Sequence, residues 1–208
     1  MKKKLVKSKF NPNKTKVSLK LAIARLRLLQ SKKSSINNTA KKEISTLLEN
    51  GKEASARIRV EQIIKEDYNI EVLEVLELFC ELLVSRYGLL LQSNDLDNSI
   101  AEAVKSIAYA APRYDIKELN DIHKELVYKF GMEINDAPYD NYGNEIHPKI
   151  YNFFKNETPS KTLVNKYLTE IANIYKIKWE CPPEEEEEKN KEEVKYHYKL
   201  LLFFNYYY

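Results

Sequence analysis

The chain has 208 residues, a length that suits one domain with a tail. It is 43% apolar and 31% charged but holds only 4 glycines and 7 prolines, which argues against collagen, flexible low-complexity chains and turn-rich all-β folds. The net charge of +3 conceals an asymmetry, because the first 42 residues contain 14 Lys and Arg and no acid. We therefore expect an all-α protein with a basic end and an acidic remainder.

The start of the chain and its cysteines indicate a cytoplasmic protein. Residues Met1 to Lys4 are basic, but no apolar run follows them, so we expect no secretory signal peptide. Cys80 and Cys181 are far apart, form no CxxC pair and are expected to be free thiols in a reducing compartment. Three glutamates interrupt the longest apolar stretch, residues 72–84, which is therefore not expected to span a bilayer.

The first predicted element is one long helix over residues 13–49, which contain neither Gly nor Pro and precede the stop signal Asn50-Gly51. Apolar residues at helical spacing form two stripes on different sides, so we expect more than one neighbour to pack on this helix. The stripes are Val17, Leu21, Ala24 and Leu28, and Leu19, Ala22, Leu26 and Leu29. One edge carries candidate membrane or polymer contacts, namely Lys16, Lys20 and Arg27, with Lys9 added if the helix extends back past Pro12.

A second long helix is predicted from about Glu53 to Leu91, with Gly88 near its end. Its second half is apolar on most sides except for a narrow acidic face formed by Glu71, Glu74, Glu77 and Glu81. With the short Gly turn between them, the two helices form a predicted αα-hairpin. The basic and the acidic helix are then antiparallel neighbours, or partners across molecules.

Shorter helices follow, and Asp95 is a candidate N-cap for the first, although Asn98 stands where a capping box has Glu or Gln. The expected ranges are 96–110, 116–130, 148–154 and 160–176, with a polar loop at 134–147. Pro182-Pro183 and the acidic run Glu184–Glu188 mark a domain end. The prediction is a basic segment at 1–12, a helical domain at 13–182, and an acidic linker with an apolar and aromatic tail at 183–208.

Residues that carry catalysis are sparse, so we expect neither an enzyme nor a cofactor. His123, His147 and His197 have no second ligand at metal spacing, and the chain has no Gly-rich phosphate loop or nucleophile motif. The glutamates of the acidic face are of the residue type that acts as paired general acid and base in some enzymes. Without a His or metal partner it is better interpreted as a solvated or partner-facing helix edge.

Several long segments in one order resemble the increased sodium tolerance family, which is ESCRT-III-like. The similar segments are residues 19–29, 41–68, 76–89, 110–113 and 161–175, and the resemblance covers about residues 10–182. It implies an ESCRT-III-like fold, a long helix 1/helix 2 hairpin with shorter helices packed back on it. It also implies a cytoplasmic role at endosomal membranes in multivesicular-body sorting to the vacuole or lysosome.

The partners that the resemblance implies are charged multivesicular body protein 1 and the AAA ATPase that disassembles ESCRT-III polymers. Some family members form filaments that coat membrane tubules, so a homo-polymer is one expectation. The alternative is a helical adaptor that binds a single ESCRT-III helix and does not polymerise. Family members carry tail motifs for the ATPase, whereas Val194–Tyr208 matches no such motif, so direct recruitment by that route is not implied.

The basic first 42 residues have three explanations: anionic lipid, acidic helices of neighbouring subunits, or nucleic acid. The resemblance favours the first two, and Phe10 is the sole aromatic there for stacking on bases, so we expect no nucleic acid. Arg57 and Arg59, in the family-like segment, are either surface ligands or partners of acids such as Glu53 or Glu61 on their own helix.

A partner helix needs an apolar groove with anchors at i, i+3, i+4 and i+7. We predict that it lies between the first and last helices, with its acids facing Lys161 and Lys166. The groove residues on the last helix are Leu163, Lys166, Tyr167 and Ile171. The alternative is that Tyr167 and Ile171 complete the core.

Overall fold

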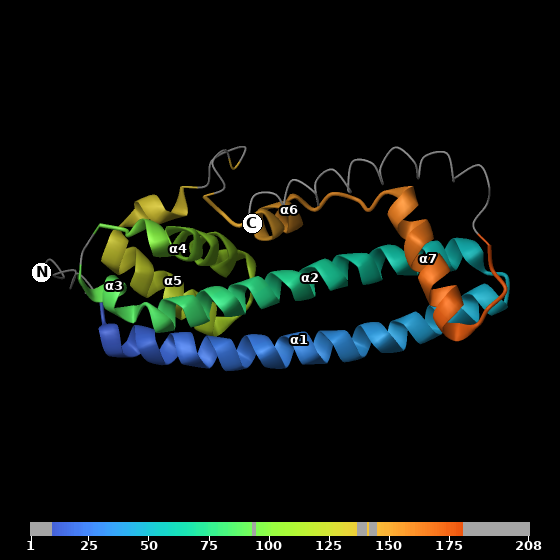
Figure 1. Cartoon of the computed structure of the whole chain (residues 1–208), viewed down its shortest axis with the longest axis horizontal. Helices are drawn as coiled ribbons and strands as arrows, with labels where there is room; N and C mark the ends of the chain where they lie inside the picture. The colour runs from blue at the N-terminus through green and yellow to red at the C-terminus, as the bar shows by residue number, and fades with distance from the viewer. Residues whose placement is uncertain (1–9, 93–94, 137–140, 142–144, 181–208) are drawn as a thin grey trace, which may run out of the picture. The chain divides into compact units, whose positions relative to one another are not determined.

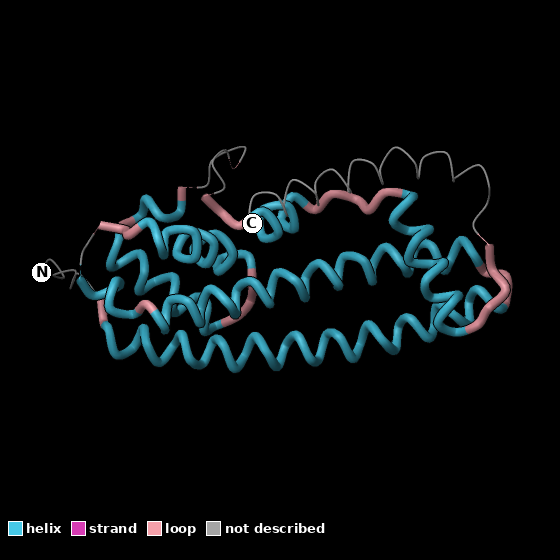
Figure 2. Tube along the Cα trace, viewed as in Figure 1, coloured by secondary structure: helices cyan, strands magenta, loops and turns pink. Residues whose placement is uncertain are grey.

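A computed structural model describes residues 10–92, 95–136, 141 and 145–180. Every regular element within these ranges is helical, and none is a strand (Figure 2). The prediction of an all-α fold is therefore confirmed.

The two longest helices are α1, Pro12–Glu49, and α2, Glu53–Ser85 (Figure 1). Gly51 lies in the turn between them at φ +68°, a left-handed conformation that glycine adopts without strain. The chain divides into two compact units, Met1–Ser34 with Tyr68–Glu157, and Ser35–Asp67 with Thr158–Tyr208. Both long helices contribute residues to each unit, and the described part of each unit has its own apolar core.

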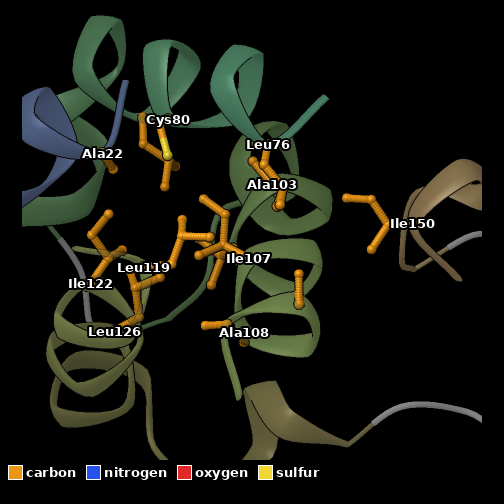
Figure 3. Close-up of a cluster of buried hydrophobic side chains, with 14 of the residues drawn as sticks. Ala22, Leu76, Cys80, Ala103, Ile107, Ala108, Leu119, Ile122, Leu126 and Ile150 are labelled. Carbon is orange, nitrogen blue, oxygen red and sulfur yellow. The ribbon is translucent and has the colours of Figure 1, made fainter. Parts of the chain in front are cut away.

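Among its described residues the first unit contains four further α-helices: α3, Tyr87–Gln92; α4, Asn98–Ala110; α5, Lys117–Phe130; and α6, Pro148–Lys155. Two short 3-10 helices, Ala111–Arg113 and Met132–Asn135, follow α4 and α5. Apolar side chains from α1, α2, α4, α5 and α6 converge on one cluster, which we call core 1 (Figure 3). Its labelled members include Ala22, Leu76, Ile107, Leu119 and Ile150.

Cys80 lies in core 1 and is fully buried, and this burial raises the pKa of its thiol to about 12. At neutral pH the thiolate that would attack an electrophile or bind a metal is therefore scarce. Cys80 is a packing residue.

The described helices of the second unit are the end of α1, the start of α2, and α7, Lys161–Tyr175. Its apolar cluster, which we call core 2, joins Ile44 and Leu48 of α1 to Val60 and Ile64 of α2 and Leu168 of α7. These described helices therefore share one core.

The expectation that both apolar stripes of α1 are packed is wrong for one of them. Leu19, Ala22 and Leu26 are fully buried, whereas Val17, Leu21 and Leu28 are exposed. The reason is what flanks each stripe. Thr15 and Ser18, beside the buried stripe, are small and bury readily, whereas Lys20 and Arg25 beside the other stripe would lose hydration on burial.

Two predicted boundaries also need correction. The second helix does not run unbroken to residue 91, because the helical pattern is interrupted at Arg86 and α3 begins at Tyr87. Gly88, a poor helix former, lies just beyond the break, after which Leu90 is fully buried in core 1. The N-cap of α4 is Asp97 and not Asp95, because the Asp97 carboxylate accepts the backbone N–H of Ser99 at 2.8 Å.

Candidate functional site

The helix α7 has defined ends. At its start the Ser160 hydroxyl oxygen accepts the backbone N–H of Leu163 at 3.2 Å. At its end Lys176 adopts φ +57°, and the backbone N–H of Ile177 donates to the carbonyl of Ala172 at 2.8 Å. Ile177 and Trp179 then pack on core 2, so the chain after the helix is held against the same unit.

The predicted groove residues on α7 differ in exposure. Leu163 and Tyr167 are half-buried against core 2, and Lys166 is exposed. Ile171 is only 2% exposed and belongs to core 2, so it supports the helix from inside and is not available to a partner. Of the two outcomes weighed for Ile171, the structure therefore places it in the core.

The sequence interpretation missed Ile174, which is 62% exposed. At 100° per residue it lies about 20° from Tyr167, whereas Ile171 lies about 40° away on the other side. We call the surface of Leu163, Lys166, Tyr167, Glu170 and Ile174 the α7 face. The apolar residues Leu163, Tyr167 and Ile174 have the helical spacing i, i+4, i+11, which is visible in the sequence. This spacing alone does not show whether Ile174 or Ile171 is the exposed residue.

Polar contacts fix α7 to α2 within the second unit. The Arg57 guanidinium donates from Nη1 to Oδ1 of Asn165 at 2.6 Å and from Nε to the Glu53 carboxylate at 2.9 Å. Asn165 is fully buried, so this charge-assisted bond stabilises an amide that water does not reach. We call these three residues the Arg57 clasp.

The second family-like arginine has a different partner from the one predicted. Arg59 donates to the carboxylate of Glu43 on α1 at 2.5 Å, rather than pairing with Glu61 on its own helix. Both side chains of this pair are about half exposed, so the pair is a surface contact between α1 and α2.

The candidate membrane or polymer contacts on α1 differ in whether their charge is already paired within the chain. Arg27 forms ion pairs with Glu77 and Glu81 of α2, so its charge is already matched. Lys16 is exposed and lies over the Tyr87 ring, with Nζ 5.4 Å from the ring centroid, and Lys20 is exposed. Lys9 lies outside the described residues.

The acidic face of α2 serves largely as an intramolecular partner. Glu77, with 13% of its side chain exposed, also accepts a hydrogen bond from the Gln30 amide at 2.7 Å. Glu71 pairs with Lys149 of α6 at 2.9 Å, whereas Glu74 is exposed to solvent. Glu71, Glu77 and Glu81 therefore do face partners, but these partners belong to the same chain. The ion pairs join α2 to α1 and α6.

Within the described ranges, no three His, Cys, Asp or Glu side chains gather as they would to hold a metal ion. None of the helices in those ranges combines the length and apolar character needed to cross a bilayer. The α7 face and the exposed surface of α1 are the surfaces considered below as candidate contacts.

Comparison with known proteins gives consistent matches. The family model described as "Ist1: Regulator of Vps4 activity in the MVB pathway" matches residues 16–178. The chain is 32% identical to an IST1-like protein of Dictyostelium discoideum, over 82% of this chain and 46% of the relative. It is 34% identical to the vacuolar protein sorting-associated protein IST1 of Saccharomyces cerevisiae, over 80% of this chain and 58% of the relative. It thus spans about half the length of these curated relatives.

A solved structure is also similar, the N-terminal domain of S. cerevisiae Ist1 in complex with the Did2 MIM motif. The match has a TM-score of 0.72 at 34% identity and covers 81% of this chain and 94% of that chain. This likeness confirms the predicted fold, an ESCRT-III-like all-α domain.

Proposed function

The chain belongs to the Ist1 family of regulators of Vps4 activity in the MVB pathway, and from this premise we propose that it binds the MIM helix of an ESCRT-III subunit through the α7 face. By holding that subunit it would modulate the AAA ATPase that disassembles ESCRT-III polymers. The partner implied by the family is charged multivesicular body protein 1. This proposal favours a regulatory scaffold, without chemistry of its own.

The observation that carries the proposal is the incomplete burial around core 2. Leu163 and Tyr167 of α7, with Ala40 and Leu47 of α1, pack on this core yet all remain partly exposed. An amphipathic helix that lies between α1 and α7 would bury what these side chains leave open. The exposed Ile174 extends the apolar line by a further two turns.

Charge on and beside the α7 face gives the partner helix an orientation. Lys161 and Lys166 are exposed and would face acidic residues of the partner, while the exposed Glu170 would face a basic one. The solved Ist1 domain was crystallised with the Did2 MIM motif, which supports a MIM motif as the ligand.

The proposal is tested with a fluorescent Did2 MIM peptide and fluorescence anisotropy. Lys166→Glu reverses an exposed charge and is expected to weaken binding about tenfold with little change in melting temperature. Lys20→Glu makes the same change in net charge on an exposed lysine of α1 and is expected to leave the affinity unchanged. Equal affinities for both variants and the wild type would place the binding surface elsewhere.

Regulation of the ATPase is tested separately. The ATPase rate of Vps4 is measured on ESCRT-III polymers with the wild type and with Lys166→Glu. If the chain acts by holding the ESCRT-III subunit, Lys166→Glu removes its effect on the rate. An unchanged effect would indicate a route that bypasses the α7 face, such as residues 183–208, which lie outside the described part.

We also infer peripheral association with anionic endosomal membranes through Lys16 and Lys20, and assembly into filaments. Negative-stain microscopy after incubation with anionic liposomes separates this inference from the adaptor alternative. Filaments or coated tubules favour assembly. A monomer that binds the MIM peptide and forms no filament favours a non-polymerising adaptor.

A further inference from the structure

Thr158 carries a hydroxyl group in the exposed loop that leads into α7. The helix α6 ends at Lys155 and α7 begins at Lys161, and the segment between them is loop (Figure 2). Thr158 is exposed, and within the described residues no hydrogen bond involves its backbone or its side chain. An enzyme can therefore reach this hydroxyl without first unfolding a helix.

The residues around Thr158 have the pattern of a substrate for a proline-directed protein kinase. Thr158 precedes Pro159, and the ring of a proline holds the residue before it in an extended conformation, which presents the hydroxyl to a kinase cleft. Lys161, three residues after the hydroxyl, is exposed and supplies a positive charge of the kind that kinases use to select substrates. Of the seven prolines, Pro159 is the one that follows a Ser or Thr, so the pattern occurs once in the sequence.

From this arrangement we propose that Thr158 is a phosphorylation site for a proline-directed Ser/Thr kinase that uses ATP. In the transfer, Oγ1 of Thr158 forms a bond to the γ-phosphorus of ATP, and the bond from that phosphorus to the β,γ-bridging oxygen breaks. ADP leaves with the electron pair of that bond, and the hydroxyl proton passes to the catalytic aspartate of the kinase. The product is a phosphothreonine with a charge of about −1.5 to −2 at pH 7.

The phosphate lies close to a charge on which the proposed function depends. Three residues of fully extended chain span at most about 11 Å, so the backbone of Thr158 stays within that distance of Lys161. The Debye length is about 10 Å at 0.1 M salt, so the two charges interact. Lys161 is one of the lysines proposed above to face acidic residues of the partner helix. Phosphorylation therefore lowers the positive potential beside the α7 face and weakens binding of the MIM helix. This consequence rests on the proposed function, whereas the phosphorylation site does not.

The experiment treats the full chain with a recombinant cyclin-dependent kinase and ATP, and mass spectrometry locates and quantifies the phosphate. A synthetic peptide of residues 152–165 is the reference for a fully accessible acceptor. Thr158→Ala removes the acceptor hydroxyl, and Pro159→Ala removes the proline but keeps the hydroxyl. Thr162→Ala is the matched control, because Thr162 is partly exposed but is followed by Leu163 rather than by a proline.

The folded chain is expected to accept phosphate at Thr158 at a rate within about tenfold of the rate for the peptide, because a site that required local unfolding would react only from a rarely populated open state. Thr158→Ala and Pro159→Ala should lose most of the incorporation, and Thr162→Ala should retain it. A slower rate, a phosphate on another residue, or equal incorporation by Pro159→Ala would overturn the proposal.

The consequence for binding is measured with the Did2 MIM peptide in the anisotropy assay. The phosphorylated chain is expected to bind about three- to fivefold more weakly than the unmodified chain at 0.1 M NaCl, since an exposed charge pair contributes up to about fivefold. The difference should shrink at 0.5 M NaCl, where the Debye length is about 4 Å. Kinase-treated Thr158→Ala should bind as the untreated wild type does. Equal affinity with and without the phosphate would overturn the regulatory role and leave the proposed function standing. An unmodified chain that does not bind the peptide would contradict the proposed function and not the phosphorylation site.

Discussion

Removing the Arg57 clasp should destabilise the second unit more than its exposed surface suggests. In Arg57→Ala, Oδ1 of the fully buried Asn165 loses the donor that lies 2.6 Å away. The loss of a hydrogen bond from a charged donor costs about 1.5–3 kcal/mol of unfolding free energy. The lost i,i+4 pair with Glu53 adds about 0.3–0.5 kcal/mol. The two losses share one side chain and do not simply add.

Arg59→Ala is the matched control, since the two arginines are two residues apart on the same helix. Its partner Glu43 is about half exposed, as Arg59 itself is, so the loss should stay below about 1 kcal/mol. Urea denaturation followed by circular dichroism measures both losses, and in a chain of this size 1 kcal/mol corresponds to roughly 2–4 °C in melting temperature. Amide hydrogen exchange should show faster opening of α7 in Arg57→Ala alone.

Two results would refute this reasoning. If Arg57→Ala and Arg59→Ala cost the same, the bond to Asn165 contributes no more than a surface contact. If Arg57→Met/Asn165→Leu is as unstable as Arg57→Ala, the loss does not come from the broken bond to the buried Asn165 amide, because that double variant removes both partners of the bond.

Three further predictions concern the rest of the chain. Glu125→Gln should lower the unfolding free energy by about 1–3 kcal/mol in urea denaturation, because this buried carboxylate accepts the Asn11 backbone N–H at 2.8 Å and Lys14 Nζ at 2.9 Å; a loss below 0.3 kcal/mol would contradict it. Burial lowers the pKa of His147 below 6.5, so the unfolded chain takes up the proton first and stability should fall as the pH drops below 6.5, with no effect above it. Melting temperatures at pH 7.5 and 5.5 should show a smaller decline for His147→Asn than for the wild type, and equal declines would argue against it. A chain of residues 1–182 should unfold as cooperatively as the full chain in a thermal scan, and a broadened transition would show that residues 183–208 pack on the domain.

The helical architecture was largely predictable because periodicity and stop signals act locally. Asn50-Gly51 ended α1 as expected, and the start of α7 followed from its apolar spacing and Ser160. The positions that failed depend on side-chain contacts made far along the chain. The acidic face was visible in the sequence, but its pairing with Arg27 and Lys149 was not, because partners 50 or more residues apart leave no periodic signal.

The two stripes of α1 and the pair Ile171/Ile174 show a second limit. Leu21 and Leu26 are both leucines in apolar stripes of the same helical spacing, yet Leu21 is exposed and Leu26 is buried. The flanking residues decide which stripe can lose its water, and a pattern of apolar positions does not include them. The choice between Ile171 and Ile174 likewise depended on how α7 is rotated about its axis against core 2, which the Arg57 clasp helps to fix.

The most direct test of the α7 face is site-specific photocrosslinking of the Did2 MIM peptide. A benzophenone amino acid is placed at Ile174, and in a matched chain at Ile58, which lies in the same unit and is 64% exposed against 62% for Ile174. We predict a crosslinked product from position 174 and none from position 58, with the position-58 chain binding the peptide as the wild type does and the position-174 chain retaining measurable binding. Crosslinking from position 58 alone, or from neither position while binding persists, would contradict it.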